Sequence, residues 1–416
     1  ELGLLVFTEI PGWQHIGGEA WKKQAVKNTE DMVLQYRNHP SIILWGVRIN
    51  ESVDDDAFYK ETNDAAHSLD PTRQTGGVRY LKKSHLLEDV YTYNDFLHDG
   101  RAPGCEKKKN VTPDMDKGYL VTEYCGHMFP TKAFDPEDHR LEHALRHANI
   151  LDAIAAEEDI AGSFGWCMAD YNTHKDFGSG DRICYHGVTD MFRVPKLAAY
   201  AYASQQDDFP VMESSSSMDV GEYPGAMIGQ TYIFTNCDYV EVFKNGVYKS
   251  TAYPDKKRYP HLPHPPISPL DFIGDALVTE DGLDEKTAAA LKNALVAANQ
   301  YGFIMPPQHY AEVVYAFLHG RMKFRQIYDI VTKHFANWGA EQITYRYDGY
   351  KDGVLVRSIT RTAVTETKLS VKADCAELIE DDTYDVTRVE LTALDGNGNR
   401  LPFANNAVKV TVDGPL

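Results

Sequence analysis

Two glutamates in this chain stand where their carboxylates could do acid–base or nucleophilic chemistry. Glu51 closes the apolar run that begins at Ile42, and Glu123 closes a second run that begins at Tyr119. Each run predicts a buried strand, so each carboxylate would lie at a strand's C-terminal end. In a (β/α) barrel these ends open onto one face, where catalytic groups gather. Two carboxylates facing one pocket suit hydrolysis of a glycosidic bond, because one can protonate the leaving oxygen while the other acts as base or nucleophile.

The same two residues have a simpler interpretation. Charged side chains usually lie in water, so a glutamate at a strand end is commonly a surface group. Taken one at a time, either glutamate is more often of this ordinary kind than catalytic.

The elements that must position these glutamates alternate along residues 1–205. Strand candidates run over Leu4–Glu9, Ile42–Val47, Gln74–Val78, Val90–Asn94, Tyr119–Glu123 and Ala161–Cys167. Helical stretches run over Glu19–Arg37, Asp56–Ser68, Asp138–Glu157 and Lys196–Ser204. This alternation predicts parallel strands joined by crossover helices. The six strand candidates fall short of the eight strands of a complete barrel.

The residues around both glutamates carry a family resemblance. Asn38–Ser41 leads into the strand that ends at Asn50-Glu51, Thr122–Tyr124 closes the second strand, and Gly165-Trp166 lies on the last one. In order, spacing and local sequence these segments resemble glycoside hydrolase family 2, which includes β-galactosidases, β-glucuronidases and β-mannosidases. The resemblance covers the first half of the chain well and the second half loosely.

The resemblance implies an α/β plus β fold: an incomplete (β/α)8 TIM barrel followed by immunoglobulin-like β-sandwich domains with a helical insert. The six strands would be barrel strands three to eight. The chain begins inside a strand candidate, so we expect a C-terminal portion that lacks the first two barrel strands and the preceding sandwich domains. The missing strands normally carry an arginine and histidines that shape the sugar pocket, and without them the chain could be a catalytically incompetent fragment.

Because the family retains anomeric configuration, the resemblance makes Glu51 the acid/base and Glu123 the nucleophile. An acid that works near neutral pH needs a raised pKa, which desolvation and a neighbouring carboxylate both supply. Once Glu123 is glycosylated its charge is gone, and the acid is then suited to activate water.

Further site residues follow from matching positions. Asn50 would hydrogen-bond the sugar 2-hydroxyl, with a strand-end cap as its alternative role. Trp166 would stack on the sugar ring, with a core position as its alternative. Glu9 matches an acidic hydrogen-bond partner on the family's third strand.

Four more candidates have weaker support. Asn94 matches an asparagine of strand six, but Asp95 stands where the family often has a tyrosine, so Tyr93 is the candidate for orienting the nucleophile. His127 and Asp170 would bind sugar hydroxyls from loops, and either could equally be a surface residue.

Two departures from the family narrow the substrate. The stretch Asp181–Gly187 lacks the Asn-x-Lys signature with which β-glucuronidases bind the sugar carboxylate. A neutral hexopyranoside, most often a β-galactoside, is therefore favoured, with a β-glucuronidase-type member as the alternative. Some β-galactosidases also hold magnesium near the acid/base. His15 is present for such a site, but Trp13 falls where the carboxylate would be, so we predict no obligate metal and no cofactor.

The second half predicts other domains after the linker Ser214–Ser217. Met227–Thr235 and Tyr239–Phe243 are strand candidates joined through Asn236–Asp238, and a hairpin turn at Asn245-Gly246 follows the second strand. The stretch from Thr235 to Gly246 resembles the immunoglobulin-like domain of the family. Amphipathic periodicity then predicts three helices, and alternating apolar residues up to Val412 predict a C-terminal sandwich. The expected domains are residues 1–210, 211–270, 271–340 and 341–416.

The composition excludes several partners. The net charge of −19 would repel nucleic acid or an anionic membrane, and no apolar run approaches the roughly 20 residues of a membrane span. Six cysteines without a pairing pattern favour free thiols in a reducing compartment, although localisation cannot be read from this chain. A carbohydrate substrate is the expected partner, and a homo-oligomer is compatible with these features.

Overall fold

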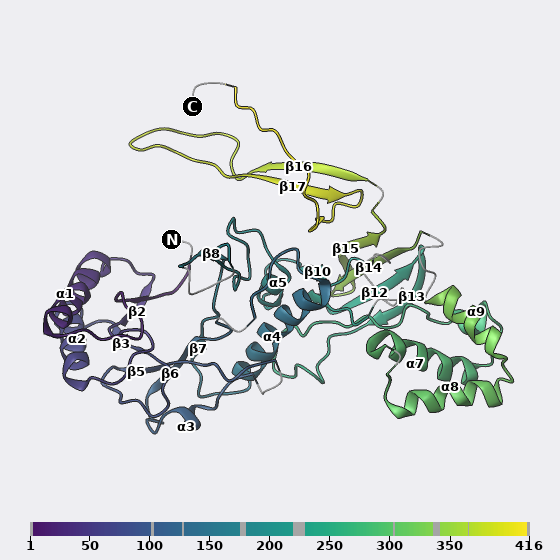
Figure 1. The fold of residues 1–416 in the computed structure, drawn as a ribbon, viewed down its shortest axis with the longest axis horizontal. Coiled ribbons are helices and arrows are strands. Elements are labelled where there is room, and N and C mark those ends of the chain that lie inside the picture. The colour runs from purple at the N-terminus through teal and green to yellow at the C-terminus, as the bar shows by residue number, and fades with distance from the viewer. Residues whose placement is uncertain are drawn as a thin grey trace. The chain divides into compact units, whose positions relative to one another are not determined.

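A computed structural model describes residues 3–100, 104–126, 129–174, 180–218, 229–302, 304–335, 342–364 and 366–413. The chain divides into two compact units, whose helices and strands are labelled in Figure 1. The first comprises Glu1–Thr131, Glu142–Tyr202 and Lys256–Pro263, and the second Lys132–Leu141, Ala203–Asp255 and His264–Leu416.

The first unit is a mixed α/β structure with parallel strands. One sheet has the order β1-β2-β3 and a second has the order β4-β5-β6-β7. The strands are β1 Val6–Glu9, β2 Ile42–Gly46, β3 Gln74–Gly76, β4 Val78–Arg79, β5 Val90–Asn94, β6 Gly118–Glu123 and β7 Gly162–Ser163. Helix α1 (Glu19–Tyr36) joins β1 to β2, α2 (Asp56–Leu69) joins β2 to β3, α3 (Lys108–Val111) lies between β5 and β6, and α4 (Glu137–Ala155) follows β6. Parallel pairing with intervening helices is the arrangement that the alternation predicts.

The core of this unit explains the position of the strand ends. Trp45 and Val47 are fully buried between β2 and its covering helices, and they belong to one cluster with Phe58 of α2. A Cβ on Gly46 would lie 2.7 Å from the Cγ of Glu9, so a glycine is required for β1 and β2 to approach where the candidate site begins.

The last predicted strand is shorter than expected. Ala161–Cys167 forms strand structure only at β7, and Trp166 lies beyond its end. The segment holds two glycines, which weaken strands, and β7 is the last strand of its sheet. An unexpected hairpin follows, in which β8 (Tyr171–Asn172) pairs with β9 (Ile183–Cys184), and helix α5 spans Leu197–Ala203.

The second unit contains a four-stranded antiparallel sheet of order β13-β12-β14-β15. Its strands are β12 Tyr239–Lys244, β13 Val247–Ala252, β14 Thr344–Lys351 and β15 Val354–Thr362. Asn245 and Gly246 join the first two with φ values of 50° and 77°, which confirms the predicted hairpin turn. Two further pairs are β10 (Met212–Ser214) with β11 (Ile233–Thr235), and β16 (Thr367–Ala373) with β17 (Val389–Asp395). The strand expected around Val408–Val412 does not form, because residues 408–413 make no ladder.

The three predicted helices of the insert are present. They are α7 (Glu285–Tyr301), α8 (Pro307–His319) and α9 (Phe324–His334), preceded by the short α6 (Ala276–Thr279). Their buried faces meet at Leu291, Leu295, Ala316 and Ile330. Other apolar residues of the stripes remain exposed, among them Val314, Leu318, Phe324 and Tyr328.

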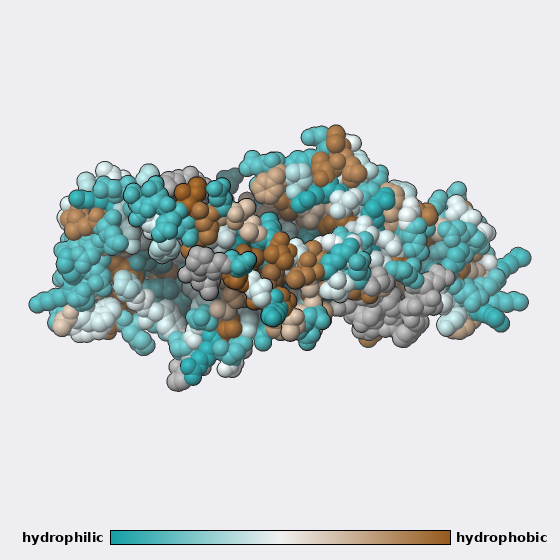
Figure 2. Space-filling view, turned by 90° about the horizontal axis from the view of Figure 1, so that it is seen from above, coloured by the Kyte–Doolittle hydropathy of each residue, from teal (hydrophilic) through white to brown (hydrophobic). Residues whose placement is uncertain are grey.

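The surface is largely hydrophilic, in keeping with the 25% of charged residues in the sequence. Hydrophilic side chains cover most of the face seen in Figure 2, with hydrophobic groups in separate clusters. All six cysteines are thiols. No helix within the described ranges could serve as a membrane span.

Candidate active site

Five polar residues lie at the C-terminal ends of the parallel strands. Glu9 ends β1, Asn50 and Glu51 follow β2, Asn94 ends β5 and Glu123 ends β6. Asn94 and Glu123 are direct partners in the register of β5 and β6. The site therefore draws on both sheets of the first unit.

The carboxamide of Asn94 joins the two glutamates that the sequence singled out. Its Nδ2 lies 3.2 Å from Oε1 of Glu51 and 3.1 Å from Oε2 of Glu123. It also lies 3.2 Å from Oδ1 of Asn50. Thr122 donates its hydroxyl to Oδ1 of Asn94 at 3.0 Å, which keeps the amino group turned toward the carboxylates. Two side chains distant in the sequence thus share one hydrogen-bond donor.

Glu123 lies in an environment that disfavours its charge. The residue is 8% exposed. Its pKa is raised to about 8, chiefly by burial and in addition by the carboxylates of Glu51 and Glu9. The backbone also closes in here, because a Cβ on Gly126 would lie 2.3 Å from Oε1 of Glu123. A nucleophile must be ionised, so Glu123 has to lose a proton before it can attack.

Glu51 is half-buried and held by two donors from the loop after β1. The indole Nε1 of Trp13 lies 2.9 Å from its Oε2, and the amide Nε2 of Gln14 lies 3.2 Å from the same oxygen. In the sequence Trp13 stands where a metal-binding carboxylate would be, and that position alone does not predict this contact. The signal available was the donor side chain of Gln14 beside the indole N–H of Trp13.

The backbone at Glu51 is unusual. Its φ is 55°, a left-handed conformation that is uncommon for residues with a side chain. Ser52 holds the turn, because its hydroxyl donates to the carbonyl of Ile49 at 2.8 Å. Arg48 adds a bond to the Ser52 carbonyl at 3.3 Å and an ion pair with Asp54 at 2.6 Å.

Glu9 acts on the site through its charge. The crowding of protein atoms around it raises its pKa to about 7, although solvent reaches the side chain. Its carboxylate adds to the raised pKa of Glu123. This places it beside the pair, while the hydrogen bond that we expected of it is absent from the described contacts.

Tyr93 does not contact the predicted nucleophile in the described part of the chain. It lies in a hydrophobic cluster with Tyr91 and Val121, and burial raises its pKa above the ordinary value. The contact with Glu123 is made by Asn94 instead. Neighbouring strand residues point to opposite faces, which explains the difference.

Asp170 lies in a buried ion pair rather than on an open loop. Its Oδ1 accepts from Lys196 Nζ at 2.6 Å and from the Gly187 N–H at 2.9 Å. Lys196 also donates to the Thr131 carbonyl at 2.6 Å. A carboxylate satisfied in this way serves packing better than sugar binding. His127 lies outside the described residues.

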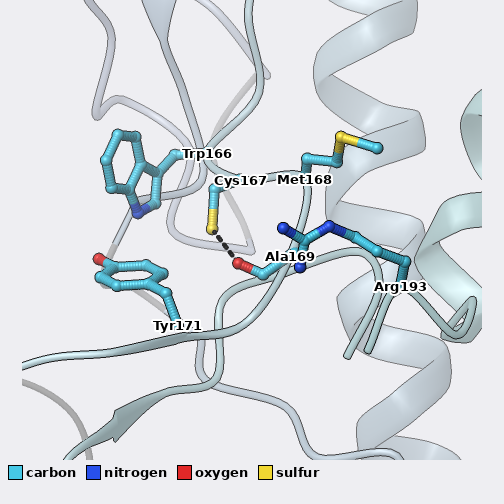
Figure 3. A pocket seen from close by; sticks show the side chains of 6 residues that line it. All are labelled: Trp166, Cys167, Met168, Ala169, Tyr171 and Arg193. Carbon is cyan, nitrogen blue, oxygen red and sulfur yellow. Dashed lines mark hydrogen bonds between the residues drawn. The ribbon is translucent and has the colours of Figure 1, made fainter. Parts of the chain in front are cut away.

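Trp166 lines a cavity of about 310 Å³ (Figure 3). Its backbone N–H donates to the Tyr124 carbonyl at 2.8 Å, which places it next to the strand end that carries Glu123. Its ring meets Tyr171 edge-on, with centroids 5.9 Å apart. The remaining lining comes from Cys167, Met168, Ala169 and Arg193. Neither Glu51 nor Glu123 lines this cavity.

Comparison with known proteins identifies a family for the part of the chain that holds these strand ends. A family model described as "Glycosyl hydrolases family 2, TIM barrel domain" matches residues 8–210. This part of the chain belongs to glycoside hydrolase family 2. The matched segment contains every strand end described above.

Two curated relatives are similar over most of the chain. A β-galactosidase of Thermoanaerobacterium thermosulfurigenes is 43% identical over 419 residues, which cover 100% of this chain and 51% of the relative. A β-galactosidase of Rhizobium meliloti is 34% identical over 385 residues, which cover 89% of this chain and 43% of the relative. The chain thus spans about half the length of these relatives.

A solved structure shares the fold. The apo structure of Bacteroides uniformis β-glucuronidase 3 matches with a TM-score of 0.55 at 20% identity, over 96% of this chain and 47% of that one. At this identity the likeness concerns architecture alone.

Proposed function

We propose that this chain is the C-terminal part of a retaining exo-β-glycosidase that hydrolyses terminal β-galactosides. The observation that carries the proposal is the shared hydrogen bond of Asn94 to both Glu51 and Glu123. Two oxygens bound to one nitrogen are separated by no more than the sum of those two bonds. This closeness of one oxygen from each glutamate agrees with the roughly 5–5.5 Å between the carboxyl groups of retaining enzymes.

The mechanism follows from that arrangement. Glu123 attacks the anomeric carbon and forms a covalent glycosyl-enzyme, while Glu51 protonates the leaving oxygen. In the second step Glu51 takes a proton from water, which attacks the same carbon and releases Glu123. Asn50 would bind the 2-hydroxyl of the sugar, and Trp166 would stack on its ring.

The raised pKa of Glu123 gives this mechanism a proton requirement. Attack needs Glu123 ionised and Glu51 protonated, whereas burial favours a proton on Glu123. Because both carboxylates contact the same amide of Asn94, a proton needs to move only between neighbouring groups. A bound sugar, whose hydroxyls can donate to Glu123, would favour the ionised form.

The substrate proposal rests on the relatives and on one sequence feature. Curated relatives at 43%, 48% and 34% identity are named β-galactosidases. The stretch Asp181–Gly187 lacks an Asn-x-Lys pair for a sugar carboxylate. The solved structures named β-glucuronidases share the fold alone and do not favour a glucuronide.

The finer architecture belongs to the same proposal. The strands β1–β7 would supply barrel strands three to eight, with β3 and β4 as two parts of one barrel strand. The antiparallel sheet β13-β12-β14-β15 would belong to an immunoglobulin-like sandwich. The domain bounds at residues 210, 270 and 340, and a homo-oligomer, stay predictions. So does independence from a metal, which chelator treatment of the active enzyme tests.

A panel of nitrophenyl glycosides tests the proposed function. The 416-residue chain is assayed beside a longer form that includes the part matched by the rest of the relatives. We expect the galactoside to be cleaved faster than the glucuronide, and the reverse order would overturn the substrate. Activity in the longer form alone would make the present chain the incompetent fragment.

A further inference from the structure

The loop that follows β1 carries a feature that the proposed mechanism does not use. Trp13 and Gln14 direct N–H groups at the same oxygen of Glu51, at 2.9 and 3.2 Å. The other oxygen of Glu51 faces Nδ2 of Asn94. The two oxygens of this carboxylate therefore have different surroundings, although they are chemically identical in a free glutamate.

We propose that Trp13 and Gln14 are positioning residues that fix Glu51 through Oε2 and leave Oε1 as the oxygen that donates and recovers the catalytic proton. This inference rests on the function proposed above. A carboxylate oxygen has two lone pairs directed at partners. Two N–H donors occupy both on Oε2, so a proton on Glu51 is directed to Oε1.

Donor chemistry makes the arrangement one-sided. An indole nitrogen can donate a hydrogen bond but cannot accept one. Trp13 therefore cannot take up the proton of Glu51, and its N–H stays directed at Oε2 in both protonation states. In the first step the proton leaves Oε1 for the departing oxygen, and in the second step Oε1 takes a proton from water. Oε2 keeps the same two bonds throughout.

The loop backbone is held where these donors need it. Gln14 has a φ of 60°, so it shares with Glu51 the left-handed conformation that marks strained functional segments when the surroundings enforce it. The enforcing contacts are the bond from the Gln14 N–H to the Asn50 carbonyl at 2.7 Å and a parallel bridge between Trp13 and Asn50.

A purely structural role is the competing explanation, because the same bonds tie the loop to the end of β2. The two explanations differ in what they predict for catalysis. If the bonds only tie the loop to the end of β2, their loss would lower the rate for all substrates alike. Loss of an acid-positioning contact would slow the substrates that need protonation and spare those with leaving groups that depart without it.

The first experiment tests the geometry without any assay of activity. The indole N–H signals of the isotope-labelled 416-residue chain are followed by NMR as pH is changed, and Trp13→Phe identifies the signal of Trp13. We expect this signal to titrate in the unmodified chain and to lose that titration in Glu51→Gln. A signal that does not titrate, or that titrates equally in Glu51→Gln, overturns the inference.

The second experiment tests the role in catalysis. Trp13→Phe and Gln14→Met remove one donor each with little change of shape. With lactose we expect kcat to fall about tenfold, the effect of losing one hydrogen bond to a charged group. With a dinitrophenyl galactoside we expect a fall of less than about twofold, because that leaving group needs no acid. KM should change little in both cases.

Matched controls exclude general damage. Trp21→Phe and Gln24→Met change the same residue types at exposed positions of α1, and we expect both variants to keep their activity on both substrates. Equal losses on lactose and the dinitrophenyl galactoside in Trp13→Phe would overturn the positioning role. A titrating indole, combined with a longer form that cleaves no galactoside, would instead refute the proposed function and leave the geometry of Glu51 standing.

Discussion

Two of the buried carboxylates of the first unit, those of Asp170 and Glu123, have opposite surroundings. Asp170 faces the ammonium group of Lys196 and a backbone N–H, and both side chains of the pair are 3% exposed. Glu123 faces an amide and two further carboxylates, and no cation pairs with it in the described contacts. Burial raises the pKa of both acids, but of the two only Asp170 has a partner of opposite charge among the described contacts.

This difference separates a structural carboxylate from a chemical one. A buried ion pair with satisfied hydrogen bonds is part of the packed interior. Removal of either partner destabilises the fold strongly, because the other charge is left buried without a partner. A buried acid surrounded by other acids is held in an unfavourable state, as at sites where a proton or a covalent bond must be exchanged. These surroundings support our proposal that Glu123 takes part in the chemistry, and they show that Asp170 is held by a buried ion pair.

The largest effect should come from Glu123→Gln. The amide keeps the shape of the side chain and removes the nucleophile, so we expect turnover to fall more than about a thousandfold. Folding should persist, because a neutral group suits this buried site better than a charge. Steady-state assays and thermal unfolding measure both effects. Normal turnover in this variant would remove the nucleophile assignment.

Lys196→Met should lower stability, whereas Glu123→Gln should lower turnover. The loss of the lysine leaves Asp170 buried without a counter-charge, which costs about 3–5 kcal/mol of stability. Urea unfolding measures the loss. The matched control is Lys351→Met, which breaks an ion pair with a largely exposed partner, Asp207, and should cost less than about 1 kcal/mol. Equal costs in the two variants would break the comparison.

Glu51→Ala should separate the acid from the nucleophile. We expect turnover of lactose to fall by about a hundredfold or more, the usual contribution of a general acid. Substrates with good leaving groups should recover most of the first step, because they depart without protonation. The measurement is the burst of released leaving group. A uniform loss on all substrates would contradict the acid role.

The smallest expected effect is a dependence of stability on pH that arises from the raised pKa of Glu123. Its pKa rises from 4.5 in the unfolded chain to about 8 in the fold. Its contribution to stability is therefore fully present below the unfolded value and is lost as pH rises toward the folded value. The loss amounts to at most about 1.4 kcal/mol per pH unit. Glu123→Gln should lack this slope, and urea unfolding of both chains at several pH values would reveal parallel curves if the site were built otherwise.

The part of the site that could be predicted lies on the strands. Apolar runs locate the ends of β2 and β6, and parallel pairing brings those ends to one edge. This reasoning, together with the family resemblance, was sufficient to bring Glu51, Asn94 and Glu123 together. The alternation of side chains also explains why Tyr93, one residue earlier, lies in the core.

Two kinds of feature could not be predicted from the sequence: the contacts made by loops, and the segments that cover the apolar face of a helix. The contacts of Trp13 and Gln14 arise from a left-handed backbone that no residue type in the loop requires. The stripe on α8 and α9 predicted helices correctly, yet Val314 and Phe324 remain exposed, because periodicity identifies an apolar face without identifying its cover. The two glycines before Trp166 shortened β7 in a similar way, through a local property that outweighed the pattern.

The absence of a side chain at Gly126 has a consequence for anyone who wishes to evolve this enzyme. Replacement of glycine by alanine adds one methyl group and would rank as a mild change on most scales. At this position the methyl carbon would lie 2.3 Å from Oε1 of Glu123, and would displace the carboxylate that we propose as the nucleophile. Libraries that randomise the segment after β6 should keep position 126 unchanged and seek altered specificity at residues farther along.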